Sequence, residues 1–223
     1  MITSYEIDWS SDYSLHNWVG QMDLMCCPKW KIGMLGTCIF SGYTTSLLWM
    51  PRLSDKYTRK TIFAAGAVFD LCLLIALLGC KSIDSMIVLC FLIGVAIPSR
   101  YHIGFVYLME LLPKSKQNFY GAFVNTFNVA GLMLAALYFR FVSKQWTYFC
   151  YLSIFMQVVC VVGTCFLPES PRLLIEHQRL DEAEQSLKTI ARWGRYNDDS
   201  GQGEWQFNKD EFTRRIDNTK SID

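Results

Sequence analysis

Residues 61–80 read TIFAAGAVFDLCLLIALLGC, and Asp70 is the one charged side chain among them. As a helix this stretch would be about 30 Å long at roughly 1.5 Å per residue, which matches the thickness of a bilayer's hydrocarbon core. A helix of this length in a water-soluble protein needs a polar face, and this stretch has none. It therefore predicts a membrane-spanning helix.

Four further stretches have the same character on either side of it. Three of them contain no Asp, Glu, Lys or Arg, and the fourth contains Arg100 beside His102; they are 32–50, 119–139, 146–167 and 86–109. Only helices and closed barrels satisfy their backbone groups inside lipid, and these stretches are too long and too evenly apolar for barrel strands. The sequence predicts an all-α, polytopic membrane helix bundle with five spans. Its expected surroundings, and so its main binding partner, are the lipids of the bilayer.

The composition of the whole chain excludes several other classes. Of its 223 residues, 52% are hydrophobic and 18% charged, with 21 basic and 20 acidic side chains and a net charge of +1. A nucleic-acid-binding protein needs a clear basic excess, and a disordered chain needs few apolar residues. An unusually hydrophobic, water-soluble globular protein remains as the alternative to a membrane protein.

Basic residues near the ends of the spans predict the orientation. They gather in the segments that follow spans one, three and five: Arg52, Lys56, Arg59 and Lys60, then Lys114 and Lys116, then Arg172, Arg179, Lys188, Arg192 and Arg195. That side is expected to be the inner one. Residues 1–28 would then be a polar outer segment, where a disulfide involving Cys26 or Cys27 is an open alternative to free thiols.

The segment after the last span predicts an amphipathic helix within 172–195 on the inner face. Leu180, Ala183, Leu187 and Ile190 share one helical stripe. Asp181 fits a helix N-cap, with Glu184 three residues later as its reciprocal acid. Residues 196–223 form a polar tail, expected to be solvated.

Three short motifs lie at matching places against the spans. LSDKYTRK occupies 53–60; FLIG at 91–94 is followed by Tyr107, Glu110 and Pro113 on the same span; and PESPRLL occupies 168–174. Together they resemble the major facilitator superfamily, most closely its sugar-porter and organic cation/anion transporter branches. The family patterns are G-x-L-x-D-R-x-G-R-R, R-F-L-x-G with Y-x-x-E-x-x-P-x-x-x-R-G, and P-E-S-P-R-W-L.

The resemblance places the five spans at helices two to six of a twelve-helix fold. It implies that substrate binds between two six-helix halves, so that this chain would need other transmembrane helices to form a cavity. It also implies a cytoplasmic latch at the first motif and an inner charge network at the other two: Asp55, Lys56, Arg59 and Lys60 for the latch, with Glu110, Glu169 and Arg172 for the network. A simple positively charged anchor is the alternative for the first motif.

The chain departs from the family pattern at four positions. Pro51 and Thr58 replace glycines, and Cys90 and Gln117 replace arginines that were expected to complete the inner network. Pro51 is expected to end or kink its helix. Lys56, Arg59 or Lys114 could replace the missing positive charge, or the network could have decayed.

Charged and amide side chains inside the spans are the remaining candidates. Asp70 and Arg100 lie at matching depths, so we expect a buried pair, with a substrate or proton path as the alternative. Asn125 and Asn128 share one helical face; with Gln157 they are candidate substrate contacts, and hydrogen bonding between helices is the alternative. Gly42 with Ser46, and Gly131 with Ala135, predict seams for close helix packing.

Catalysis, cofactors and metals are not indicated by any motif. The sequence predicts a facilitator for small organic ions or sugars that is incomplete and not transport-competent alone, through a missing helix or an incomplete gene. The alternative is a degenerate transporter half that serves as a structural subunit of a larger membrane complex.

Overall fold

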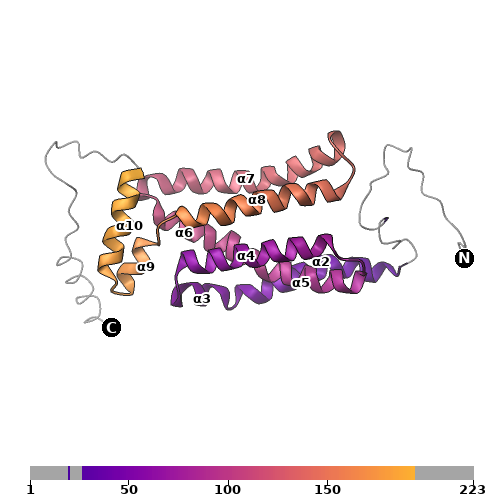
Figure 1. The fold of residues 1–223 in the computed structure, drawn as a ribbon, viewed down its shortest axis with the longest axis horizontal. Helices are drawn as coiled ribbons and strands as arrows, with labels where there is room; N and C mark the ends of the chain where they lie inside the picture. The colour runs from indigo at the N-terminus through magenta and orange to yellow at the C-terminus, as the bar shows by residue number, and fades with distance from the viewer. Residues whose placement is uncertain (1–19, 21–26, 194–223) are drawn as a thin grey trace, which may run out of the picture.

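The computed structural model describes residue 20 and residues 27–193. The expectations for the N-terminal segment, for Cys26 and for the polar tail at 196–223 therefore fall largely outside the described residues. Within the described part the chain is helical, and its helices form an elongated bundle (Figure 1).

Four of the described helical segments are long and apolar enough to cross a membrane: α4 (Arg59–Leu78), the continuous run Ile83–Leu111, α7 (Lys114–Phe141) and α8 (Trp146–Phe166). They correspond to the predicted spans at 61–80, 86–109, 119–139 and 146–167. The run Ile83–Leu111 is built from α5 (Ile83–Pro98), η2 (Ser99–Ile103) and α6 (Gly104–Leu111).

The first predicted span differs from these four. It folds as α2 (Lys29–Leu47), followed by the short helix α3 (Met50–Lys56), and it is absent from the helices that qualify as membrane-spanning. Its second half carries a run of small and hydroxyl side chains from Ser41 to Ser46, which lowers its hydropathy. The helix breaks just before Pro51, as expected: α2 ends at Leu47, the residue whose carbonyl group would otherwise accept a hydrogen bond from position 51. Pro51 itself lies in the first turn of α3, where a missing N–H costs no hydrogen bond.

Two glycines allow α2 and α5 to pack closely. A Cβ atom at Gly42 would lie 2.2 Å from the backbone oxygen of Phe91, and one at Gly94 would lie 2.1 Å from that of Ile39. The seam predicted at Gly42 is therefore present. The seam predicted at Gly131 is not, because a Cβ atom there would meet nothing within 4 Å.

A π-helical turn interrupts the second long span. Pro98 ends α5 and has no N–H, so the ladder of i to i−4 hydrogen bonds cannot continue through it. The next five residues, Ser99–Ile103, form η2, and the helix resumes as α6. The wider turn includes Arg100 and His102.

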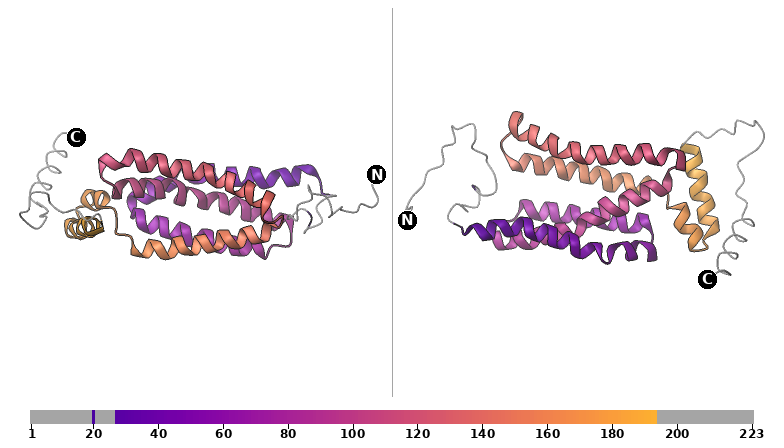
Figure 2. Two further views of the ribbon diagram at one scale, coloured as in Figure 1. Left: turned by 90° about the horizontal axis from the view of Figure 1, so that it is seen from above. Right: turned by 180° about the vertical axis from the view of Figure 1, so that it is seen from behind.

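The hairpin of α7 and α8 lies along one side of the bundle (Figures 1 and 2). Helix α8 packs against α4, whereas no described residue of α7 is buried. Many large apolar side chains of α7 are exposed, among them Leu132 at 77%. In a bilayer this surface is available to lipid or to other helices.

Two short helices cross one end of the bundle. These are α9 (Pro171–Glu176) and α10 (Leu180–Trp193), separated by a turn in which Gln178 has a φ of 61° (Figure 2). Helix α10 has the predicted extent and buries Ala183 and Ser186, but Asp181 lies in its first turn and not at the N-cap. Glu184 and Lys188 form an i,i+4 ion pair on this helix, with Lys188 Nζ 2.9 Å from Glu184 Oε1.

Candidate functional site

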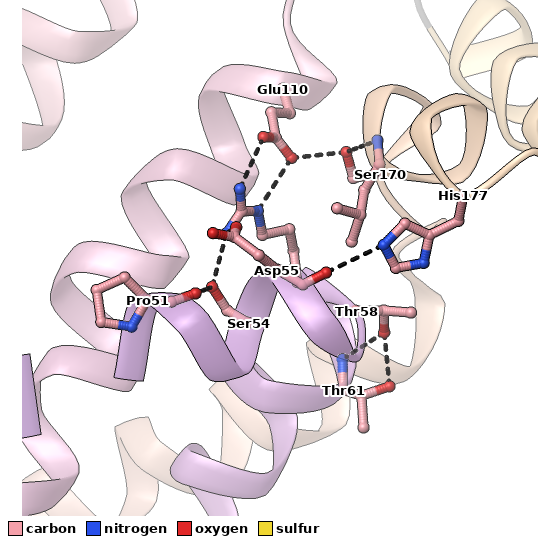
Figure 3. A network of polar contacts seen from close by, with 10 residues as sticks. Pro51, Ser54, Asp55, Thr58, Thr61, Glu110, Ser170 and His177 are labelled. Carbon is pink, nitrogen blue, oxygen red and sulfur yellow. Dashed lines mark hydrogen bonds and ion pairs between the residues drawn. The ribbon is translucent and has the colours of Figure 1, made fainter. Parts of the chain in front are cut away.

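Arg59 is the centre of a polar network at the end of the bundle where α3, α4, α6 and α9 meet. Figure 3 shows the other members Ser54, Asp55, Glu110 and Ser170 close together. It is the first residue of α4, and its side chain is 15% exposed. Its Nη1 lies 2.6 Å from Asp55 Oδ1 and donates a hydrogen bond of 2.6 Å to Ser54 Oγ. Asp55 and Arg59, both named for the latch in the first motif, therefore form an ion pair.

Glu110 is the second acid of this network and comes from the last turn of α6. Its side chain is 8% exposed, and its Oε2 lies 3.5 Å from Arg59 Nε. Ser170 Oγ donates a hydrogen bond of 2.6 Å to the same Oε2 and accepts from the N–H of Leu173, which makes Ser170 the N-cap of α9. One carboxylate thus joins α4, α6 and α9.

Glu169 is next to Ser170 in the sequence and contacts the start of α4 through Thr58, not through Arg59. Thr58 caps α4 by accepting from the N–H of Thr61, and its hydroxyl donates to Glu169 Oε1 at 3.2 Å. The Ser186 hydroxyl donates to the backbone oxygen of Glu169 at 2.6 Å, which attaches α10. Thr58 occupies a glycine position of the family pattern and has an extended backbone, so a threonine fits there.

Two further contacts close the same end. Lys60 Nζ donates to the backbone oxygen of Leu167 at 2.6 Å, at the end of α8. His177 Nε2 donates to the backbone oxygen of Asp55 at 3.1 Å, from the end of α9 to α3. The first and third motifs therefore meet at a common end of the bundle, as the membrane interpretation requires.

Two predicted members do not join the network. Arg172 is exposed on α9, and Lys56 is exposed with its Nζ 5.8 Å from the ring centre of Tyr57. Pro171, Leu173 and Leu174 on α9 are buried, whereas Arg172 lies on the exposed face of the same helix. Arg59 supplies the positive charge for which Lys56 and Lys114 were the alternatives.

Cys90 and Gln117 also depart from the expectation. Cys90 is buried in an apolar cluster with Leu35 and Met86, about 30 Å from Glu110 along the helix axis, so a side chain there cannot complete the network. Gln117 instead holds the turn between α6 and α7. Its Nε2 donates to the backbone oxygens of Met109 at 2.9 Å and Leu112 at 3.1 Å.

A second polar cluster lies at mid-span. Arg100 Nη1 lies 3.4 Å from Asp70 Oδ2 and donates to Gln157 Oε1 at 2.9 Å. Gln157 Nε2 donates in turn to the backbone oxygen of Ala67 at 2.9 Å. The Asp70–Arg100 pair predicted from matching depths is present, and Gln157 joins α8 to it.

Asn125 and Asn128 lie elsewhere, on the exposed surface of α7. Both line a cavity of about 220 Å³ together with His102 and Phe105. Asn128 Nδ2 donates within its own helix to the oxygen of Val124, so the alternative of hydrogen bonding between helices is not realised there. Across η2 and α2, His102 Nε2 and Tyr43 Oη lie 2.6 Å apart.

Sequence reasoning missed the uncharged members of the end network. Ser54 and Ser170 are fully buried hydroxyls beside Arg59 and Glu110, and Tyr107 donates a hydrogen bond to the backbone oxygen of Pro168. A serine directly before Pro171 was a readable N-cap signal. Nothing in the local sequence of Ser54 indicated its partner.

The long apolar helices, closed at one end by a polar network, define an integral, multi-pass membrane protein. The sequence model of the family described as sugar (and other) transporter matches residues 4–221. The chain therefore belongs to this family, and the resemblance to the major facilitator superfamily is confirmed.

Curated relatives give the same result. The chain is 27% identical to solute carrier family 22 member 16 of Mus musculus over 183 residues, covering 79% of this chain and 27% of the relative. It is 27% identical to organic cation/carnitine transporter 2 of Homo sapiens, covering 83% of this chain and 33% of the relative. For organic cation transporter 1 of Caenorhabditis elegans the identity is 27%, with 83% of this chain and 32% of the relative covered. The chain thus spans about a third of the length of the curated relatives that it matches.

Proposed function

We propose that this chain forms part of a facilitator that moves small organic ions or sugars across a membrane. Its family membership supports this proposal, because relatives named as organic cation and carnitine transporters match most of the chain. The observation that carries the proposal is the end network around Arg59 and Glu110, at the positions of the family's motifs.

The network has the properties of a latch on the inner side of the membrane. It joins four helices through one guanidinium and one nearly buried carboxylate. The pairing of Arg59 with Asp55 is the more exposed part, since the Asp55 side chain is 60% exposed. A partner that attracts Asp55 would loosen α3 while the Glu110–Ser170 contact holds α6 to α9.

Transport by this chain would require transmembrane helices in addition to the ones described. Helix α7 has no buried residue, and Asn125 and Asn128 on it are exposed. A solute path needs walls on all sides, so further transmembrane segments would cover this face and turn the two asparagines into solute contacts.

Flux measurements test this function. The full-length chain, with any chain that co-purifies with it, is reconstituted in vesicles, and uptake of labelled organic ions and sugars is measured. We expect saturable uptake that falls at least about tenfold in Glu110→Gln, because the latch then loses the charge that orders its contacts. Absence of uptake for all solutes, with and without co-purifying chains, would remove the proposal.

A structural subunit of a larger membrane complex is the second candidate. The exposed apolar surface of α7 favours it, since such a surface is suited to stable contact with other helices. This function predicts that the chain purifies in fixed stoichiometry with other membrane proteins after mild detergent extraction. A freely migrating monomer would contradict it.

A further inference from the structure

The cluster of Asp70, Arg100 and Gln157 lies deep in the bundle and apart from the end network. Asp70 is about 16 Å from the start of α4 at Arg59, and Arg100 is about 16 Å from the end of α6 at Leu111, at roughly 1.5 Å per residue. Both residues therefore lie near the middle of their spans. A charge at that depth is costly and commonly marks a solute or ion path.

The contacts within this cluster are incomplete. Asp70 is 1% exposed, yet neither of its carboxylate oxygens accepts a hydrogen bond from any described residue. Its distance of 3.4 Å to Arg100 Nη1 gives charge attraction without a hydrogen bond. Both contacts of Arg100 use Nη1, and its Nε has no hydrogen-bond partner in the described part of the chain. A purely structural pair would be expected to use the guanidinium fork in two parallel bonds.

Arg100 also lines a cavity. It has a volume of about 540 Å³ and is bounded by α4, η2 and α8. Its walls combine aromatic and apolar side chains with three polar groups: Phe63, Phe149, Leu152, Met156 and Cys160 with Arg100, Ser153 and Gln157. The Arg100 side chain is 37% exposed, whereas Asp70 is not among the residues that line the cavity. This is the size and composition typical of small-molecule sites, with a few polar groups on apolar walls.

We propose that Arg100 binds the carboxylate of a small organic solute in this cavity, with Asp70 as the internal counter-ion that the solute replaces. This inference rests on the proposed transport function and names the charged group that the solute carries. Gln157 holds Nη1 in place through its own bond to the backbone of Ala67. The exposed part of the Arg100 side chain, 37% of it, binds the carboxylate, and the apolar walls take the remainder of the molecule.

The sign of the charge follows from which group the cavity exposes. An organic cation would need to reach Asp70, but Asp70 is buried and does not line the cavity, whereas Arg100 does. A carboxylate instead meets a partly free guanidinium, the group best suited to bind it with two hydrogen bonds. Asp70 competes for the same guanidinium, so removing the charge of Asp70 strengthens binding.

Fluorine NMR tests this proposal without requiring transport. The full-length chain is placed in lipid nanodiscs and titrated with 4-fluorobenzoate, and line broadening gives a dissociation constant. The uncharged 4-fluorobenzyl alcohol and the cation 4-fluorobenzylammonium are matched probes. We expect Asp70→Asn to bind the carboxylate at least about fivefold more tightly, and Arg100→Gln to lose at least about tenfold, the range of one charge-assisted pair.

A double variant separates binding from folding. Arg100→Gln alone leaves Asp70 buried without a counter-ion and can unfold the protein, whereas Asp70→Asn with Arg100→Gln leaves a neutral cluster. The double variant is expected to elute as the folded protein does and to bind no carboxylate. Carboxylate binding by the double variant at the parental affinity overturns the proposal, as does binding of the ammonium probe that depends on Asp70.

Flux data then distinguish the two proposals. Parental carboxylate binding without any solute flux removes the transport function and leaves the Arg100 site. Flux of a carboxylate solute that is unchanged in the folded double variant removes the Arg100 site and leaves the transport function.

Discussion

The pair of Arg59 and Glu110 offers the sharpest test of the end network. At 3.5 Å, two unit charges attract by about 5 kcal/mol for an effective dielectric constant of roughly 20. Both side chains are largely withdrawn from water, at 15% and 8% exposure, so desolvation offsets much of this attraction. We therefore expect a net coupling free energy of about 2 kcal/mol between them.

A double-mutant cycle measures that coupling. The free energy of unfolding is determined in mixed micelles by titration with a denaturing detergent for the parent, Arg59→Gln, Glu110→Gln and the double variant. Arg59→Gln is expected to be the more destabilising single variant, because it leaves Glu110 without a positive partner at low exposure, whereas Arg59 keeps its pair with Asp55 in Glu110→Gln. The double variant is expected to be less destabilised than the sum of the two single variants by about 2 kcal/mol.

Asp55→Asn is the matched control for this cycle. Asp55 lies 2.6 Å from the same guanidinium, but its side chain is 60% exposed, and exposed pairs contribute less than about 1 kcal/mol. A coupling below about 0.5 kcal/mol for Arg59 with Glu110, or a larger coupling for Arg59 with Asp55, would refute the view that burial makes Glu110 the principal partner.

Substitutions at four further positions test the packing and the helix ends by the same unfolding titration. Gly94→Ala is expected to cost about 1–3 kcal/mol because its Cβ would overlap the Ile39 backbone, whereas Gly131→Ala is expected to be neutral or to stabilise by up to about 1 kcal/mol through helix propensity; equal effects would contradict the packing of α2 on α5. Ser170→Ala is expected to cost about 1–2 kcal/mol by removing a helix cap and a bond to Glu110, and a change within 0.5 kcal/mol, roughly the scatter at neutral surface sites, would show that neither matters. Gln117→Ala is expected to cost about 1–2 kcal/mol through two lost bonds to backbone oxygens, and Gln117→Arg should recover part of it if an arginine can reach the same oxygens.

The apolar spans and the ends of several helices could be predicted from local sequence. Thr58 and Ser170 begin helices as N-caps, and Pro171 directly follows the second of these caps. The extent of α10 follows from its stripe of apolar residues. These features depend on neighbours within one or two turns, so they are legible without the fold.

The partners of the charged residues were only partly predictable. Matching depth was enough to pair Asp70 with Arg100, because two buried charges on neighbouring spans favour each other strongly. The family pattern was not enough to locate Cys90. This residue lies on the same helical run as Glu110, but it belongs to an apolar cluster far from Glu110 along that run. Family spacing suggested Arg172 for the network, whereas the face of α9 decides that it points outward.

The sequence by itself determined that this chain is a set of helices in lipid, since hydropathy and length act along each segment independently of its neighbours. It also determined the family, through motifs that are read locally. Only the tertiary structure decided that Ser54, Arg59, Glu110 and Ser170 form one network, and that Arg100 lines a cavity. Such contacts join residues that are distant along the chain, and they depend on how helices rotate and cross, which local sequence does not specify.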